Sequence, residues 1–161
     1  MRAALALLAV LAGAAGAQTR APARPSTLVG ELRADLIVAR RERLAHAGAG
    51  FTRALGAYAR AGLLLGAGVD ASPSRDAAPS GRADAILRVT TDPFAEQRRA
   101  VYVVAGVSAR ATQDRPGRTD LLLAIGLEGR ARRGWTRALE IGLGGGVRAG
   151  VSLRRLRQGR R

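Results

Sequence analysis

The sequence of 161 residues contains no cysteine, no lysine and no asparagine, and it has only five aromatic residues. The lack of cysteine excludes disulfide bonds and thiolate metal sites, and it removes the acceptor for a lipid anchor after a signal peptide. Stability must therefore come from packing and from hydrogen bonds. With a single histidine and with carboxylates interleaved among arginines, the sequence predicts neither a metal site nor a cofactor.

Long hydrophobic runs are missing after the first 17 residues. Residues 1–17 begin with Met1-Arg2, continue with the apolar run Ala3–Leu11 and end on Ala15-Gly16-Ala17, which predicts a cleaved signal peptide and an exported chain. No later apolar run approaches the roughly 18 residues of a membrane helix, so membrane insertion would have to use β-strands. The expected organisation is a leader at 18–26, one domain at 27–156 and a basic tail at 157–161.

Basic residues are abundant, and all 27 of them are arginine. Against 12 acidic residues they give a formal charge of +15 and a pI near 11.9. A balance of this kind is typical of nucleic-acid binding. An exported protein does not meet the nucleic acids of the cytoplasm, and five aromatic residues are too few for a basic surface on which bases stack. We therefore expect no nucleic-acid partner.

Apolar and polar residues alternate in eight segments of the chain. On one parity these segments carry 9 arginines and 8 acidic residues, and on the other parity only Arg53 and Arg137 are charged. This period of two predicts β-strands with two different faces. Residues 31–46 also fit a helix by composition, but a helix would scatter the charges around its axis. The eight segments are 28–39, 45–54, 57–70, 82–92, 100–112, 118–130, 135–144 and 147–154.

Turn signals separate the eight segments. Residues 71–81 are predicted to be the longest loop, and 113–117 form a second loop with a Pro-Gly pair. The run Gly144-Gly145-Gly146 predicts a tight hairpin turn. Eight antiparallel strands joined by short turns predict an all-β, closed up-and-down barrel.

Alternation alone does not say which face of the barrel points outward. A soluble lipocalin-like barrel is apolar inside, whereas an outer-membrane barrel is apolar outside. The segments have 8 to 14 residues, which exceeds the usual strand of about 5–6 and favours a membrane barrel. So does the polar face, because balanced charges and small residues suit a narrow lumen. A soluble periplasmic barrel that binds a lipid or another apolar ligand is the alternative.

In its alternating strands, short turns and signal peptide, the stretch 27–156 resembles the small eight-stranded outer-membrane barrels of the outer-membrane protein A and X type. The resemblance is one of pattern and not of motif. It implies a transmembrane barrel in the outer membrane. We expect a monomer in contact with outer-membrane lipid, with a structural or interaction role and no enzymatic activity.

The charged residues of the polar parity are predicted to fill the lumen as a network of salt bridges. Eight strands leave room for side chains or one small ligand, which disfavours the alternative of a porin-like conductance pathway. The predicted lumen residues are Glu31, Arg33, Asp35, Arg60, Asp84, Arg88, Arg110, Asp120, Glu128, Glu140 and Arg148.

Most remaining arginines lie at the turns of the end that would face the periplasm. They predict a basic rim in contact with anionic lipid head groups, where each arginine contributes about 1 kcal/mol. The predicted rim residues are Arg53, Arg98, Arg99, Arg132, Arg133, Arg155 and Arg157.

His46 is the one candidate for catalysis. Some outer-membrane barrels of this size modify lipids with a histidine, a serine and a carboxylate, and the hydroxyl must lie within hydrogen-bond reach of the imidazole. The neighbours of His46 on its own face are Leu44 and Gly48, and no His-x-Ser motif is present. We therefore predict no catalytic residues.

Overall fold

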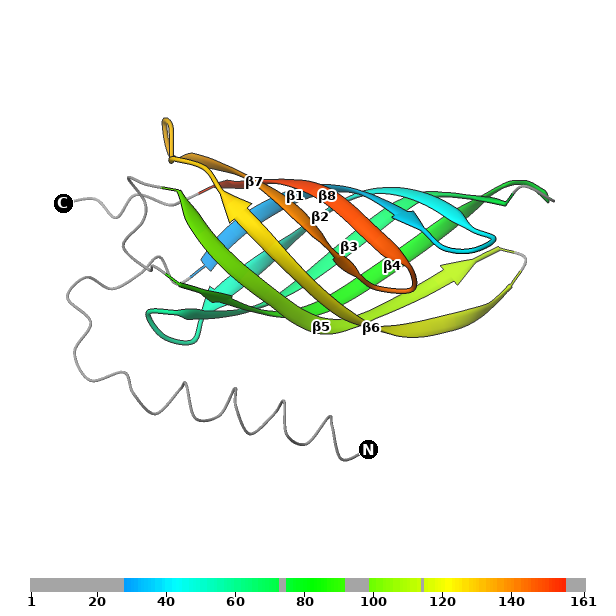
Figure 1. Ribbon diagram of the computed structural model, residues 1–161, viewed down its shortest axis with the longest axis horizontal. Coiled ribbons are helices and arrows are strands. Elements are labelled where there is room, and N and C mark those ends of the chain that lie inside the picture. The colour runs from blue at the N-terminus through cyan, green and yellow to red at the C-terminus, as the bar shows by residue number, and fades with distance from the viewer. Residues whose placement is uncertain (1–27, 73–74, 92–98, 114, 156–161) are drawn as a thin grey trace, which may run out of the picture.

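Eight antiparallel strands close into a barrel in the computed structural model, which describes residues 28–72, 75–91, 99–113 and 115–155 (Figure 1). Each strand pairs with the next, and β8 pairs with β1. The predicted all-β, eight-stranded up-and-down barrel is therefore confirmed. The strands are β1 (Leu28–Val38), β2 (Arg43–Ala54), β3 (Ala59–Ser72), β4 (Arg75–Thr90), β5 (Ala100–Thr112), β6 (Arg115–Glu128), β7 (Trp135–Leu143) and β8 (Val147–Arg155).

The predicted signal peptide at 1–17, leader at 18–26 and basic tail at 157–161 lie outside the described residues. Within the described part, the up-and-down order gives the barrel two different ends. We call the end where β1 begins and β8 ends the terminal end. The opposite end carries the β1–β2, β3–β4, β5–β6 and β7–β8 connections, and we call it the hairpin end (Figure 1).

Two predicted loops at the hairpin end are largely strand. The loop expected at 71–81 is wrong, because β3 runs to Ser72 and β4 already begins at Arg75. The loop expected at 113–117 is also too long, because β6 begins at Arg115. Composition indicated turns in both places, but backbone pairing with the neighbouring strand extends the hairpins.

Pro79 shows how the ladder accommodates a residue that usually marks a loop. It lies opposite Val69 on β3, while the pairing of β4 with β5 starts one residue later, at Ser80. Proline has no N–H to donate, so it fits a strand at a position where pairing with one of the two neighbouring strands has not yet begun. A bulge near the tip of each long hairpin, between Asp70 and Ser72 and between Arg110 and Thr112, accommodates the remaining irregularity.

The strands bury charge and expose apolar side chains. Along β1, exposed and buried residues alternate strictly. Leu32 and Leu36 are about half exposed, whereas Glu31, Arg33 and Asp35 are buried. The apolar parity therefore points outward and the polar parity points into the barrel. This settles the question of facing that the sequence left open.

The interior also holds a small apolar cluster next to the buried charges. Tyr102 on β5 is fully buried at its centre, and a Cβ atom added at Gly126 would overlap the ring of Tyr102. A glycine is required there because the tyrosine fills the space that a side chain would need. The cluster consists of Leu64, Ile86, Tyr102, Val104, Leu122, Ala124 and Ala138.

Candidate functional site

Asp35 on β1 is the hub of the buried charges. Its Oδ1 atom accepts hydrogen bonds from Nε of Arg33 at 3.0 Å and from Nε of Arg148 at 2.9 Å. Its Oδ2 atom accepts from Nη2 of Arg148 at 2.9 Å and from Nη2 of Arg82. One carboxylate thus binds guanidinium groups from β1, β4 and β8 and links these three strands across the lumen.

Asp84 on β4 gives two of the same arginines a second partner. Its Oδ2 atom lies 3.2 Å from Nη2 of Arg148, and its Oδ1 atom lies 3.2 Å from Nε of Arg82. Ser108 on β5 donates to Oδ1 of Asp84 at 2.7 Å. Hydrogen bonds and ion pairs together therefore satisfy this buried carboxylate, as burial of charge requires.

Glu31 and Glu140 form a second cluster nearer the terminal end. Nη2 of Arg88 lies 3.0 Å from both carboxylate oxygens of Glu31 and 3.4 Å from Oε1 of Glu140. The hydroxyl of Tyr102 donates to Oε1 of Glu140 at 2.7 Å. Arg33 pairs with Glu140 as well as with Asp35 and so joins the two clusters into one.

We call the joined clusters the central network. It is charge-balanced, because its four arginines face four carboxylates, and every member is buried. Balance of this kind lets charges stay ionised away from water, since each has a partner of opposite sign. The members are Glu31, Arg33, Asp35, Arg82, Asp84, Arg88, Glu140 and Arg148.

Four predicted lumen residues lie outside the central network. Arg110 pairs with Glu42 at 2.9 Å, and Glu128 pairs with Arg154 at 3.0 Å. Both pairs are less buried than the central network. Asp120 pairs with Arg118 at 2.8 Å, and that arginine side chain is 56% exposed. Arg60 is only partly buried on β3.

Several residues of the lumen were missed as site residues by sequence reasoning. Arg82 and Arg154 share the polar parity, so the alternation carried a signal for both. Tyr102 also shares that parity, but it is uncharged and was not counted with the lumen charges. Its ring lies 4.8 Å from the Arg88 guanidinium carbon and 5.0 Å from that of Arg154. Glu42 lies in the connection between β1 and β2, and its carboxylate reaches Arg110 on β5. These contacts depend on three-dimensional closure.

His46 has a serine partner that the sequence did not indicate. Its Nε2 atom lies 2.8 Å from Oγ of Ser80, and both residues are buried. The missing His-x-Ser motif therefore did not exclude a serine partner, because the serine comes from another strand. Nδ1 of His46 has no hydrogen-bond partner among the described residues. Asp35 on β1 is in register with His46 and would be a candidate for a third member, but its carboxylate already binds three arginines.

Exposed arginines gather at the terminal end. Five of the seven predicted rim residues are described, and all five are exposed there: Arg53, Arg99, Arg132, Arg133 and Arg155. Arg98 and Arg157 lie outside the described residues. The guanidinium of Arg155 lies 5.7 Å from the centre of the Trp135 ring. Contact of this rim with lipid head groups stays a prediction.

The connection between β6 and β7 holds one rim arginine in an unusual conformation. Arg132 and Trp135 exchange two backbone hydrogen bonds, at 2.8 and 3.0 Å, around Arg133 and Gly134. Both central residues have positive φ, 52° for Arg133 and 76° for Gly134. This is the pattern of a type I′ turn, which favours Asn-Gly over Arg-Gly.

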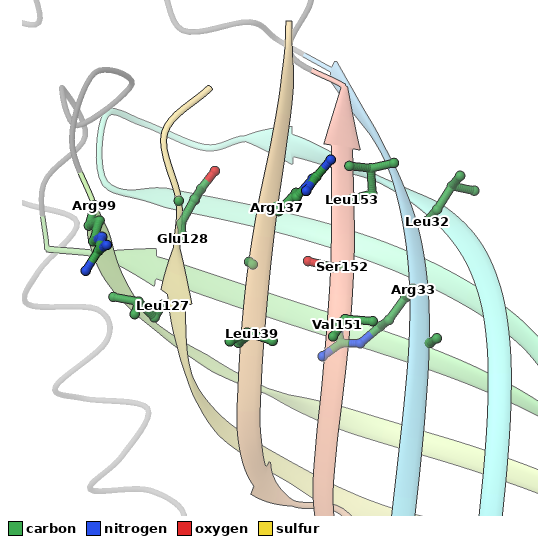
Figure 2. Close-up of a pocket in the computed structure, with 13 residues that line it drawn as sticks. Leu32, Arg33, Arg99, Leu127, Glu128, Arg137, Leu139, Val151, Ser152 and Leu153 are labelled. Carbon is green, nitrogen blue, oxygen red and sulfur yellow. The ribbon is translucent and has the colours of Figure 1, made fainter. Parts of the chain in front are cut away.

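A groove of about 670 Å³ lies along the terminal half of the barrel wall where β6, β7, β8 and β1 meet (Figure 2). Its outward-facing lining combines apolar side chains such as Leu127, Leu139 and Val151 with Arg99 and Arg137. A metal site is not formed in the part of the chain that the structure describes. No group of three or more His, Asp or Glu side chains there could hold a metal ion.

The described residues include no helix that is long and apolar enough to span a membrane.

Comparisons with known proteins identify no family. No protein-family model matches the chain, and no curated protein matches it. Among solved structures, the chain is similar to the solution NMR structure of the de novo designed TMB2.3, with a TM-score of 0.49 and 14% sequence identity. The match covers 84% of this chain and 97% of that chain. The barrel fold itself follows from the pairing of the strands.

Proposed function

We propose that this protein is a monomeric outer-membrane β-barrel with a structural or interaction role and no catalytic activity. The reversal of burial is the observation that carries the proposal. Among the described residues, 23 large apolar side chains are exposed, whereas only 11 hydrophobic residues are buried. An apolar surface of this extent is unfavourable in water and typical of a wall that contacts lipid.

The interior supports the membrane barrel over the soluble alternative. A lipocalin-like carrier needs an apolar interior to hold a lipid or another apolar ligand. Here the centre of the barrel is occupied by the central network, with Asp35 bonded to three arginines. A buried network of paired charges would bind an apolar ligand poorly, because the ligand would displace ion pairs without replacing their partners.

The same packing favours a closed lumen. The central network reaches from β1 to β4 through Glu31 and Arg88 and from β1 to β8 through Asp35 and Arg148. Side chains that cross the interior in this way leave little room for a water-filled path, as expected for eight strands. Single-channel recording of the barrel in a planar bilayer should show no steady conductance, and a stable open level would contradict the closed lumen.

The His46–Ser80 pair is proposed to be structural. A serine nucleophile needs a base that is in turn oriented by a third group, and the carboxylate of Asp35 is committed to arginines. Both residues are also buried in the lumen. The refolded barrel should not hydrolyse a soluble ester above background. Hydrolysis that Ser80→Ala abolishes would show that the barrel is an enzyme.

The rim of exposed arginines is proposed to face the periplasm and to meet anionic head groups of the inner leaflet. The support is the position of Arg53, Arg99, Arg132, Arg133 and Arg155 at one end of an apolar wall. Vesicle binding should therefore increase with the fraction of anionic lipid and decrease with salt. Equal binding to neutral and anionic vesicles would contradict this role.

Cell fractionation tests the proposed location. The full chain, expressed in a Gram-negative host, should remain in the Sarkosyl-insoluble outer-membrane fraction. Recovery in the soluble periplasmic fraction would instead support the lipocalin-like carrier. The two outcomes exclude each other, because a barrel with an apolar outer surface of this extent is not stable in water.

A further inference from the structure

Arg137 is an exception to the charge pattern of the outer wall. It lies on the apolar parity of β7, between Trp135 and Leu139, and it is exposed. In register it faces Leu153 of β8. An arginine on the lipid side of a membrane barrel costs about 2–4 kcal/mol at the midplane and about 0–1 near the interface. Arg137 therefore needs an interfacial position or an anionic partner.

Arg99 lies in the same groove as Arg137 (Figure 2). It directly precedes β5, which begins at the terminal end, as β7 does. Among the described residues, no acidic side chain forms a salt bridge with either arginine. Glu128 also lines the groove, but its carboxylate pairs with Arg154 at 3.0 Å. The groove therefore carries two positive charges without a described counter-charge.

Leu153 and Leu32 line the groove at the level of Arg137, and the rest of its apolar lining lies farther from the terminal end. Leu139 is two residues beyond Arg137 along β7, and it is in register with Leu127 on one side and Val151 on the other. All three side chains are exposed. The groove thus runs from two arginines near the rim to a strip of leucine and valine nearer the middle of the wall. A phospholipid has the same arrangement, because its charged head group is followed by a hydrocarbon acyl chain.

Small residues leave the space in which a ligand would lie. Gly129 donates its backbone N–H to the carbonyl of Arg137 at 2.8 Å and has no side chain to fill the position beside it. On the other side of the groove, Ala34 of β1 is in register with Val151, and its small side chain does not fill the groove. The hollow next to the two arginines is therefore built by the local sequence.

We propose that this groove binds one anionic glycerophospholipid, with its phosphate between Arg99 and Arg137 and one acyl chain along Leu127, Leu139 and Val151. Charge complementarity selects the ligand class, because two guanidinium groups favour a head group with a net negative charge over a zwitterionic one. The inference rests on the proposed function, since the groove meets lipid only if the apolar wall lies in a bilayer.

Native mass spectrometry of the refolded full chain tests the site. The probes are phosphatidylglycerol and phosphatidylcholine with the same acyl chains, added separately to the protein in detergent. The wild type should retain one phosphatidylglycerol in preference to phosphatidylcholine. Arg137→Gln should weaken that binding about tenfold, the size expected for one lost charge-assisted hydrogen bond. Arg53→Gln is the matched control, because Arg53 is also an exposed arginine on the apolar parity and does not line the groove.

A second variant changes the shape of the groove without changing its charge. Ala34→Leu adds bulk on the β1 side of the groove and should also weaken retention of phosphatidylglycerol, while an exposed position on the wall tolerates the larger side chain. Equal losses in Arg137→Gln and Arg53→Gln would overturn the site, because they indicate diffuse attraction by the rim. Unchanged binding in Ala34→Leu would overturn it too.

These outcomes are distinguishable from failure of the proposed function. Insertion of the wild type into vesicles of phosphatidylcholine is measured first, and it does not depend on the groove. A wild type that does not insert contradicts the membrane barrel and the lipid site together. A wild type that inserts but retains no phosphatidylglycerol contradicts the lipid site alone.

Discussion

Replacing Asp35 with asparagine removes the negative charge that three buried arginines share. Arg33, Arg82 and Arg148 all bond to this carboxylate, and all are buried. Asparagine keeps the size of the side chain and one acceptor oxygen, but its NH₂ group would face guanidinium donors. Removing one partner of a buried ion pair typically costs about 3–5 kcal/mol, and we expect Asp35→Asn to fall in this range.

The partly exposed pair of Arg118 and Asp120, with side chains 56% and 14% exposed, provides the matched control. Asp120→Asn makes the same chemical change in a pair whose arginine side chain is 56% exposed. Solvent and salt screen such a pair, so its loss should cost no more than about 1 kcal/mol. The difference between the two variants measures what the three buried arginine partners of Asp35 add to the same chemical change.

Urea unfolding of the refolded barrel, followed by tryptophan fluorescence, measures both costs. Trp135 is the single tryptophan and lies at the start of β7. The double variant with Arg148→Gln should lose less than the sum of the single losses, with a coupling of roughly 0.5–3 kcal/mol. Additive losses, or an Asp35→Asn cost equal to that of Asp120→Asn, would refute a lumen held by coupled charges.

Three further substitutions test other parts of the barrel, each with the same unfolding assay. Leu65→Arg places a charge on the 68% exposed outward position in the middle of β3 and should cost about 2–4 kcal/mol in vesicles, so unchanged stability would mean that this wall does not meet lipid. Arg133→Asn should stabilise the barrel by about 1 kcal/mol, because asparagine tolerates the φ of 52° better than arginine, and no gain would mean that the turn is unstrained. Gly126→Val should destabilise it by about 1–3 kcal/mol through overlap with Tyr102, and a neutral effect would show that the interior is loosely packed.

The strands could be predicted because the pleat of a strand places successive residues on opposite faces. Charges such as Glu31, Arg33 and Asp35 therefore mark one face without any knowledge of the fold. The direction of that face could not be predicted from alternation, since it depends on how the sheet closes. The loop at 71–81 failed for a related reason. Serine, proline and glycine indicate turns locally, but the ladder with β3 holds residues from Arg75 onward in β4.

The sequence could not predict which charged residues of the lumen pair with each other. Glu31 and Arg88 are 57 positions apart and belong to β1 and β4, which are not neighbours in the sheet. Their contact depends on the stagger of the strands and on the width of the lumen, and alternation specifies neither. His46 and Ser80 meet in the same way, across 34 positions. Local motifs have no information about such pairs.

The orientation of the wall can be measured directly, because a chain without cysteine accepts single cysteines one position at a time. Along β5, Val101, Val103 and Val107 are exposed, whereas Tyr102 and Val104 are buried. A spin label at each position from 101 to 107, in the barrel refolded into vesicles, reports collisions with oxygen from the lipid and with a nickel complex from water. We expect odd positions to collide with oxygen and not with nickel, and Tyr102 and Val104 to be shielded from both. Strong collisions of the odd positions with the nickel complex would show that this face meets water and would contradict the membrane barrel.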